Sequence, residues 1–233
     1  MPDNNTNHKH RATGNRQVPG SLLALLTASS GALCIAAGTG LLASWLTFVF
    51  KPLTTILIIA YAWKRGHDLP AQRRLILAGL VLSLAGDVFL LWPKEGFLFG
   101  LVSFLLAHLL YILAFCIPAP FAARPAFFVG YALVAAGILS QLWNAVPPAL
   151  RIPVVAYVVF LATMAAQAAG WWRSAPAGSR AGWAAAGGLL FMASDTLLAF
   201  NKFATPLPLA PLWILATYWT AQWCIASAMT RAA

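Results

Sequence analysis

Eight long apolar stretches make up most of this 233-residue chain. They cover residues 21–38, 41–63, 74–92, 96–117, 125–143, 149–170, 183–201 and 209–229. Because a helix needs about 20 mainly apolar residues to cross a bilayer, each stretch suits one crossing. With 61% hydrophobic and only 9% charged residues, the chain has too little polar surface for a soluble domain. These features predict an all-α fold, a polytopic membrane protein built as a bundle of about eight transmembrane helices.

The first twenty residues differ from the rest of the chain. They are polar, contain His8, Lys9, His10, Arg11 and Arg16, and show no hydrophobic periodicity. Such a composition is typical of a disordered tail. We therefore expect a polar cytoplasmic tail at 1–20 and one eight-span domain at 21–233.

Basic residues are distributed unevenly between the connecting segments. The net charge is +10, from 15 Lys and Arg against 5 Asp and Glu. One side of the predicted bundle collects eleven of them: Lys9, Arg11, Arg16, Lys64, Arg65, Arg73, Arg74, Arg124, Arg173, Arg180 and Arg231. The other side has Lys94, Arg151 and Lys202. Basic loops stay in the cytoplasm, so we expect cytoplasmic termini, a bacterial inner membrane and no nucleic-acid partner.

Two aspartates lie inside the apolar stretches, in similar surroundings. Asp87 follows Leu84-Ala-Gly and Asp195 follows Phe191-Met-Ala-Ser, and each precedes an apolar half-turn. Each lies twelve residues from the predicted cytoplasmic entry of its span, about 18 Å along the helix. Ionisable groups at such depth are costly and are functional candidates by default. We predict that Asp87 and Asp195 form a catalytic pair facing a common cavity.

Other polar side chains within the spans are candidate substrate-binding residues. They are Lys51, His108, Tyr111, Ser194, Tyr218 and Gln222. Lys51 is equally compatible with catalysis, with pairing to an aspartate and with phosphate binding. His108 suits either polar packing or a site, and the tyrosines and Gln222 also suit hydrogen bonds between helices. Cys34, Cys116 and Cys224 are isolated and predict neither a disulfide framework nor a metal site.

Five motifs follow one another along the chain. They are Lys51-Pro52-Leu53, Gly86-Asp87-Val-Phe-Leu-Leu91, Phe97 with Gly100, Phe104, His108 and Tyr111, Gly188 with Ser194-Asp195, Leu198 and Ala199, and Tyr218 with Gln222. In order and spacing they resemble the motifs of the YhhN family of lysoplasmalogenases, and the resemblance spans about residues 51–229.

The resemblance implies an integral membrane hydrolase of eight helices. Its substrate would be a lysoplasmalogen, a single-chain phospholipid whose chain is joined through a vinyl ether. The products would be a fatty aldehyde and glycerophosphoethanolamine or glycerophosphocholine. By the same resemblance, Asp87 and Asp195 are the catalytic residues of an ether hydrolase.

Vinyl ether chemistry suits a pair of carboxyl groups. The bond resists base but is cleaved after protonation at carbon, which gives an oxocarbenium ion that water captures. Burial in apolar surroundings favours the neutral form of a carboxyl group. One aspartate can therefore donate the proton while the other, ionised, stabilises the cation and activates water. The sequence does not assign the two roles.

Two other functions are compatible with intramembrane acids. A zinc-dependent hydrolase needs about three protein ligands, and His108 is the single histidine within a predicted span. We therefore expect no metal and no cofactor. A transporter or proton-coupled carrier using the two aspartates as a relay is the alternative function. Expected partners are the lipid substrate and the surrounding membrane lipid, and the oligomeric state stays open.

Overall fold

The computed structural model describes residues 19–229. Within that range the chain forms eight α-helices and one π-helical turn, with no strand. Their bounds are α1 Gly20–Gly38, α2 Leu46–Trp63, α3 Pro70–Phe89, α4 Phe97–Cys116, α5 Pro125–Leu142, α6 Pro148–Ser174, α7 Ala181–Ala199, η1 Phe200–Ala204 and α8 Ala210–Ser227. Nearly all of the predicted 1–20 tail lies outside the described residues.

Six of these helices are long and apolar enough to cross a membrane: α1, α2, α4, α5, α6 and the continuous α7–η1. Helices α3 and α8 have similar lengths, 20 and 18 residues, but more polar side chains. Several of those side chains, such as Asp87 and Gln222, are buried inside the protein. Because they face other helices and not lipid, the bundle accommodates them. The predicted polytopic helical bundle is confirmed.

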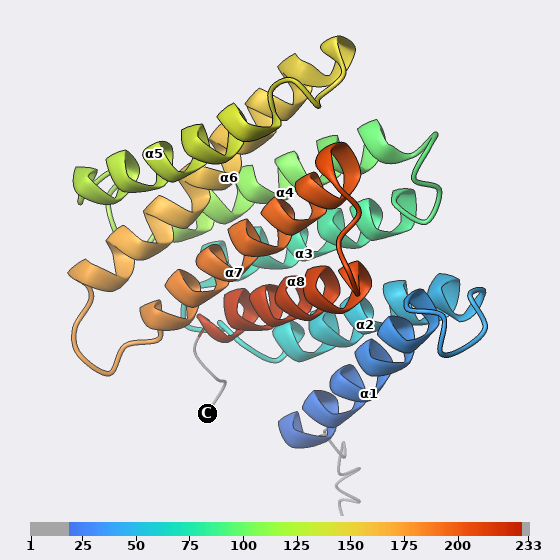
Figure 1. The fold of residues 1–233 in the computed structure, drawn as a ribbon. Helices are drawn as coiled ribbons and strands as arrows, with labels where there is room; N and C mark the ends of the chain where they lie inside the picture. The colour runs from blue at the N-terminus through green and yellow to red at the C-terminus, as the bar shows by residue number, and fades with distance from the viewer. Residues whose placement is uncertain (1–18, 230–233) are drawn as a thin grey trace, which may run out of the picture.

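Six helices form a closed ring around the polar interior. Following contacts between neighbours, the ring runs α2, α3, α4, α6, α7 and α8, and α8 packs back on α2. Helices α1 and α5 lie outside it at opposite ends of the bundle (Figure 1). Only Ala135 and Leu142 of α5 are buried. Helix α5 is therefore a peripheral element that packs mainly on α6.

Glycines on α3 permit close packing against aromatic rings of α4. A Cβ added at Gly79 would lie 2.4 Å from the Tyr111 ring, and one at Gly86 would lie 2.5 Å from the Phe104 ring. No larger residue fits there without displacing a ring. Small residues at helix contacts are the usual means of close approach in membranes, and they place Asp87 directly beside α4.

The starts of two helices differ most from the prediction. Helix α2 begins at Leu46, not near residue 41, because Gly40 takes a positive φ of 82° and the chain turns there. Lys51, at the middle of the predicted 41–63 stretch, therefore lies in the second turn of α2. Helix α3 begins at Pro70, a residue suited to the first helical position. Asp87 is thus two residues from the α3 C-terminal end.

Candidate active site

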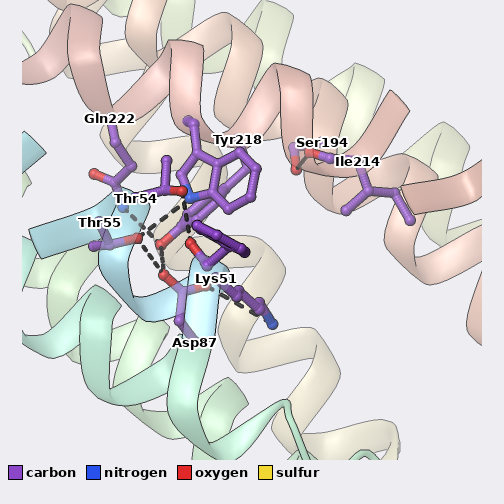
Figure 2. Close-up of polar contacts among 10 residues, drawn as sticks. Lys51, Thr54, Thr55, Asp87, Ser194, Ile214, Tyr218 and Gln222 are labelled. Atoms are coloured by element: carbon purple, nitrogen blue, oxygen red, sulfur yellow. Dashed lines mark hydrogen bonds and ion pairs between the residues drawn. The ribbon is translucent and has the colours of Figure 1, made fainter. Parts of the chain in front are cut away.

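Asp87 lies at the centre of a buried cluster of hydrogen bonds contributed by α2, α3 and α8 (Figure 2). Its Oδ2 accepts hydrogen bonds from the Thr55 hydroxyl at 2.6 Å and the Tyr218 hydroxyl at 2.8 Å. Its Oδ1 lies 3.9 Å from Nζ of Lys51. Asp87 is 1% exposed and Lys51 is 9% exposed. The carboxyl is therefore held by a cation and two hydroxyls, away from lipid.

The cluster continues through polar groups on α8 and α4. Gln222 donates from Nε2 to the Tyr218 oxygen at 3.4 Å, and its Oε1 accepts from the Tyr111 hydroxyl at 2.8 Å. Tyr111 also lies 3.4 Å from the Ser83 hydroxyl. This chain of contacts joins three members of the predicted site, Tyr111, Tyr218 and Gln222, to Asp87.

Asp195 has different surroundings on the opposite part of the ring. It is partly buried on α7, and its Oδ2 accepts a hydrogen bond from the Tyr157 hydroxyl of α6. Both residues line a groove bounded by α4, α5, α6, α7 and η1. Among the described residues, no cation forms an ion pair with Asp195. Its carboxyl therefore differs from that of Asp87 in both partners and access.

The groove is almost entirely apolar and contains about 800 Å³ of empty space, its open mouth included. Its ionisable lining residues are Asp195, Tyr157 and, at one end, Lys202. The rest of the lining includes Phe97, Leu101, Phe104, Ile138, Leu142, Val154, Leu161 and Met192. A cavity with few polar groups in an apolar wall is the usual form of a site for a lipid-like ligand.

The expectation of one cavity shared by both aspartates is wrong for this groove, because Asp195 lines it and Asp87 does not. Aromatic side chains pack in a continuous series from one carboxyl environment to the other. Tyr218, bonded to Asp87, packs edge-on against Phe104 at 5.7 Å and against Phe191 at 5.5 Å between ring centroids. Phe104 in turn lines the groove. The two carboxyls are thus connected through aromatic packing.

None of the six predicted substrate-binding residues lines the groove. Lys51, Tyr111, Tyr218 and Gln222 belong to the Asp87 cluster. Ser194 donates to the Ile214 carbonyl at 3.0 Å, and this contact joins α7 to α8 away from Asp87 (Figure 2).

His108 is fully buried beside the groove wall. Its ring centroid lies 5.2 Å from that of Tyr157 and 4.6 Å from that of Phe191. Neither ring nitrogen has a hydrogen-bond partner within residues 19–229. His108 therefore packs against the partner of Asp195 without bonding to either aspartate.

Sequence reasoning missed Thr55 and Tyr157, which bond to the two carboxyls, and Lys202, which lines the groove. Thr55 comes four residues after Lys51, one helical turn away on the same face, and this spacing was readable. Tyr157 lies in a long apolar stretch without a second polar residue nearby, so no motif marked it. Lys202 lies just after a predicted span, where a basic residue is expected in a connecting loop.

Within residues 19–229, no group of three His, Cys, Asp or Glu side chains comes together. Asp87, Asp195 and His108 are the intramembrane candidates, and the first two contact hydroxyls instead. The donor set of the site is therefore oxygen from carboxyls and phenols.

Comparison with known proteins identifies the family to which the chain belongs. A sequence profile of the YhhN family matches residues 46–229. The chain belongs to the YhhN family. The matched region contains α2 to α8, hence the complete ring and every residue of the two carboxyl environments, and leaves α1 outside.

Curated relatives of this YhhN protein are named as enzymes. It is 36% identical over 190 residues to lysoplasmalogenase TMEM86B of Sus scrofa, covering 81% of this chain and 77% of the relative. The human TMEM86B is 34% identical, with the same coverage. A lysoplasmalogenase of Mycobacterium tuberculosis is 34% identical over 66% of this chain and 59% of its own length. No solved structure matches significantly.

Proposed function

We propose that this YhhN-family protein is a lysoplasmalogenase in which Asp195 is the catalytic acid. The observation that carries the proposal is the position of Asp195, a carboxyl group with a hydroxyl partner on the wall of an otherwise apolar groove. The names of the relatives support the same activity. They give no support to transport, the alternative compatible with the sequence.

The reaction begins with transfer of a proton from Asp195 to the outer carbon of the vinyl ether. The alkene π electrons form the new C–H bond, and the ether oxygen stabilises the resulting oxocarbenium ion. Tyr157 donates a hydrogen bond to Oδ2, so it stabilises the carboxylate that the transfer leaves behind. General acid catalysis of this kind contributes about 10² to 10⁴ in rate.

Water completes the hydrolysis. It adds to the carbon next to the ether oxygen, and its proton returns to the Asp195 carboxylate. The hemiacetal then breaks at the bond to the glycerol oxygen. Asp195 protonates that oxygen, which leaves as the alcohol, and the hemiacetal hydroxyl returns its proton to Asp195 as the aldehyde carbonyl forms. One water is consumed, and the products are a fatty aldehyde and the glycerophospho-alcohol.

Asp87 supports the reaction through its contacts in this proposal. It bonds Tyr218, whose ring packs against Phe104 on the groove wall. We assign it as an ionised carboxylate, because Lys51 and two hydroxyls all favour the charged form. Asp87 is thus a positioning residue, although the sequence predicted it as a member of a catalytic pair.

The site lies in the membrane half opposite the cytoplasm, given the predicted orientation. Residues 21–233 would then form one hydrolase domain in a bacterial inner membrane, with both termini cytoplasmic. The charge asymmetry supports this orientation, and the apolar helices support the membrane location.

The test is aldehyde release by the protein purified in detergent. Lysoplasmenylethanolamine should yield fatty aldehyde, whereas the saturated alkyl-ether analogue should yield none, because it has no alkene to protonate. Activity should survive EDTA. The proposal fails if the vinyl ether substrate releases no aldehyde, and the metal-free mechanism fails if EDTA abolishes turnover and zinc restores it.

A further inference from the structure

We propose that Lys202 binds the substrate phosphate and thereby fixes the direction in which the lipid lies in the groove. This inference rests on the proposed function and names a binding residue for the same site. Lys202 is the cation that lines the groove, and it lies on η1 directly after α7, the helix of Asp195.

Two parts of the groove wall, α7–η1 and α4, show which end Lys202 occupies. Along α7 and η1 the lining runs Met192, Asp195, Ala199 and Lys202, towards the end of the bundle at the α3–α4 loop. Phe97, the first residue of α4, lines the groove near that end. The Lys202 Nζ lies 4.1 Å from the centroid of the Phe97 ring.

The deeper end of the groove is apolar on each neighbouring helix. Met192 lies one turn before Asp195 on α7, and Leu161 lies one turn after Tyr157, the partner of Asp195, on α6. Both are on the side of Asp195 away from Lys202. The order along the groove is therefore cation, carboxyl, apolar pocket. A lysoplasmalogen has the same order of phosphate, vinyl ether and hydrocarbon chain.

The spacing also fits. Lys202 follows Asp195 by seven residues, about 10 Å along a helix axis. In the substrate, seven bonds separate phosphorus from the outer carbon of the vinyl ether, the atom that Asp195 protonates, roughly 9 Å when extended. This length is close to the separation of Asp195 and Lys202 along the helix. A phosphate at Lys202 therefore places the vinyl ether beside Asp195.

The other cations near this end of the bundle do not line the groove. Lys51 is paired with Asp87 and does not line the groove. The Arg151 guanidinium stacks over Trp143 at 4.9 Å and also lies outside the lining. Lys202 is exposed, its one hydrogen bond is to the Pro93 carbonyl at 3.4 Å, and within residues 19–229 it forms no ion pair. Its charge is therefore available to an anion.

The apolar path continues beyond the groove between α5 and α6. A second hollow shares Ala135, Leu139 and Val158 with the groove and extends to Phe128. From Leu142 to Phe128 the path follows fourteen residues of α5, roughly 21 Å of helix. This length suits a fatty chain, and the peripheral position of α5 gives lipid lateral access.

The experiment compares two vinyl ether substrates, lysoplasmenylethanolamine and the matching alkenylglycerol without phosphate. The measured quantity is the ratio of their kcat/KM values. We expect Lys202→Gln to lower that ratio roughly tenfold, mainly through KM, since one charge-assisted contact is lost. Lys202→Arg should retain it. Lys94→Gln removes an exposed lysine on the same side that does not line the groove, and it should leave the ratio unchanged.

The outcomes separate this inference from the proposed function. If wild-type protein cleaves neither substrate, the function is wrong. If wild type is active and Lys202→Gln has the wild-type ratio, or Lys94→Gln lowers it equally, the phosphate site is wrong. Should Lys202→Gln fail to fold, the wild-type ratio measured at rising ionic strength decides, because screening must lower it if a lysine recognises the phosphate.

Discussion

Asp87 and Asp195 have matching sequence contexts but are held by different partners. Asp87 accepts hydrogen bonds from two hydroxyls and pairs with Lys51, whereas Asp195 accepts a hydrogen bond from Tyr157 beside an open groove. An intramembrane carboxyl needs partners of some kind, and in the proposed mechanism the partners distinguish the positioning carboxyl from the reacting one. Variants at the two positions should therefore fail in different ways.

Asp195→Asn should lower kcat/KM for lysoplasmenylethanolamine by about 10² to 10⁴, because the amide cannot donate the catalytic proton. The thermal midpoint should stay near the wild-type value, because the asparagine side chain can still accept the hydrogen bond from Tyr157. No buried cation loses an ion-pair partner in this variant. Tyr157→Phe should cost roughly tenfold, the loss of one charge-assisted hydrogen bond. Tyr131→Phe on α5 is the matched control. An Asp195→Asn protein with near wild-type aldehyde release would remove this residue from the mechanism.

Asp87→Asn should lower stability by about 3 kcal/mol, because it leaves the buried Lys51 without its carboxylate. The readout is thermal unfolding in detergent, compared with Asp195→Asn. Adding Lys51→Met removes the unpaired buried charge. The double variant should therefore recover most of the loss in thermal midpoint. Equal midpoints for the two Asn variants, or no rescue by Lys51→Met, would contradict a structural ion pair.

Helix pairs in this bundle depend on small residues that admit aromatic rings. Tyr111 lies against Gly79 and bonds Gln222, so the α3–α4 contact and the link to α8 share one side chain. Gly79→Ala should destabilise the protein by about 1 to 3 kcal/mol through overpacking. Gly130→Ala on α5 meets nothing within 4 Å and should be neutral or slightly stabilising. Unfolding midpoints test this, and equal effects would mean that α3 and α4 are less tightly packed.

The whole bundle has an orientation that its charges predict. A phosphatase reporter fused after Arg231 should be inactive, and one inserted after Lys94 should be active, because the basic loops stay in the cytoplasm. Activity of the first fusion would reverse the predicted orientation and would place the Lys202 end of the groove on the cytoplasmic side.

Much of this architecture was predictable from hydropathy. Each apolar stretch is recognised from its own residues, because the bilayer sets its length, and most predicted spans lie within a few residues of an observed helix. The shift in α2 arose from Gly40, whose turn no average over a window reports. The two aspartates were predictable for a similar local reason, since a charge among apolar residues is conspicuous in the sequence.

The sequence by itself determined the class of protein, the number and approximate bounds of its helices, the family and the two candidate carboxyls. The tertiary structure alone decided which faces meet: Thr55 and Lys51 with Asp87, Tyr157 with Asp195, and Lys202 with the groove. The physical reason is that lipid is as apolar as the interior of the bundle. The hydrophobic pattern of a membrane helix therefore does not show which of its faces points inward. Rotation and neighbours are set by packing between helices, and only the assembled ring separates the groove from the buried ion pair.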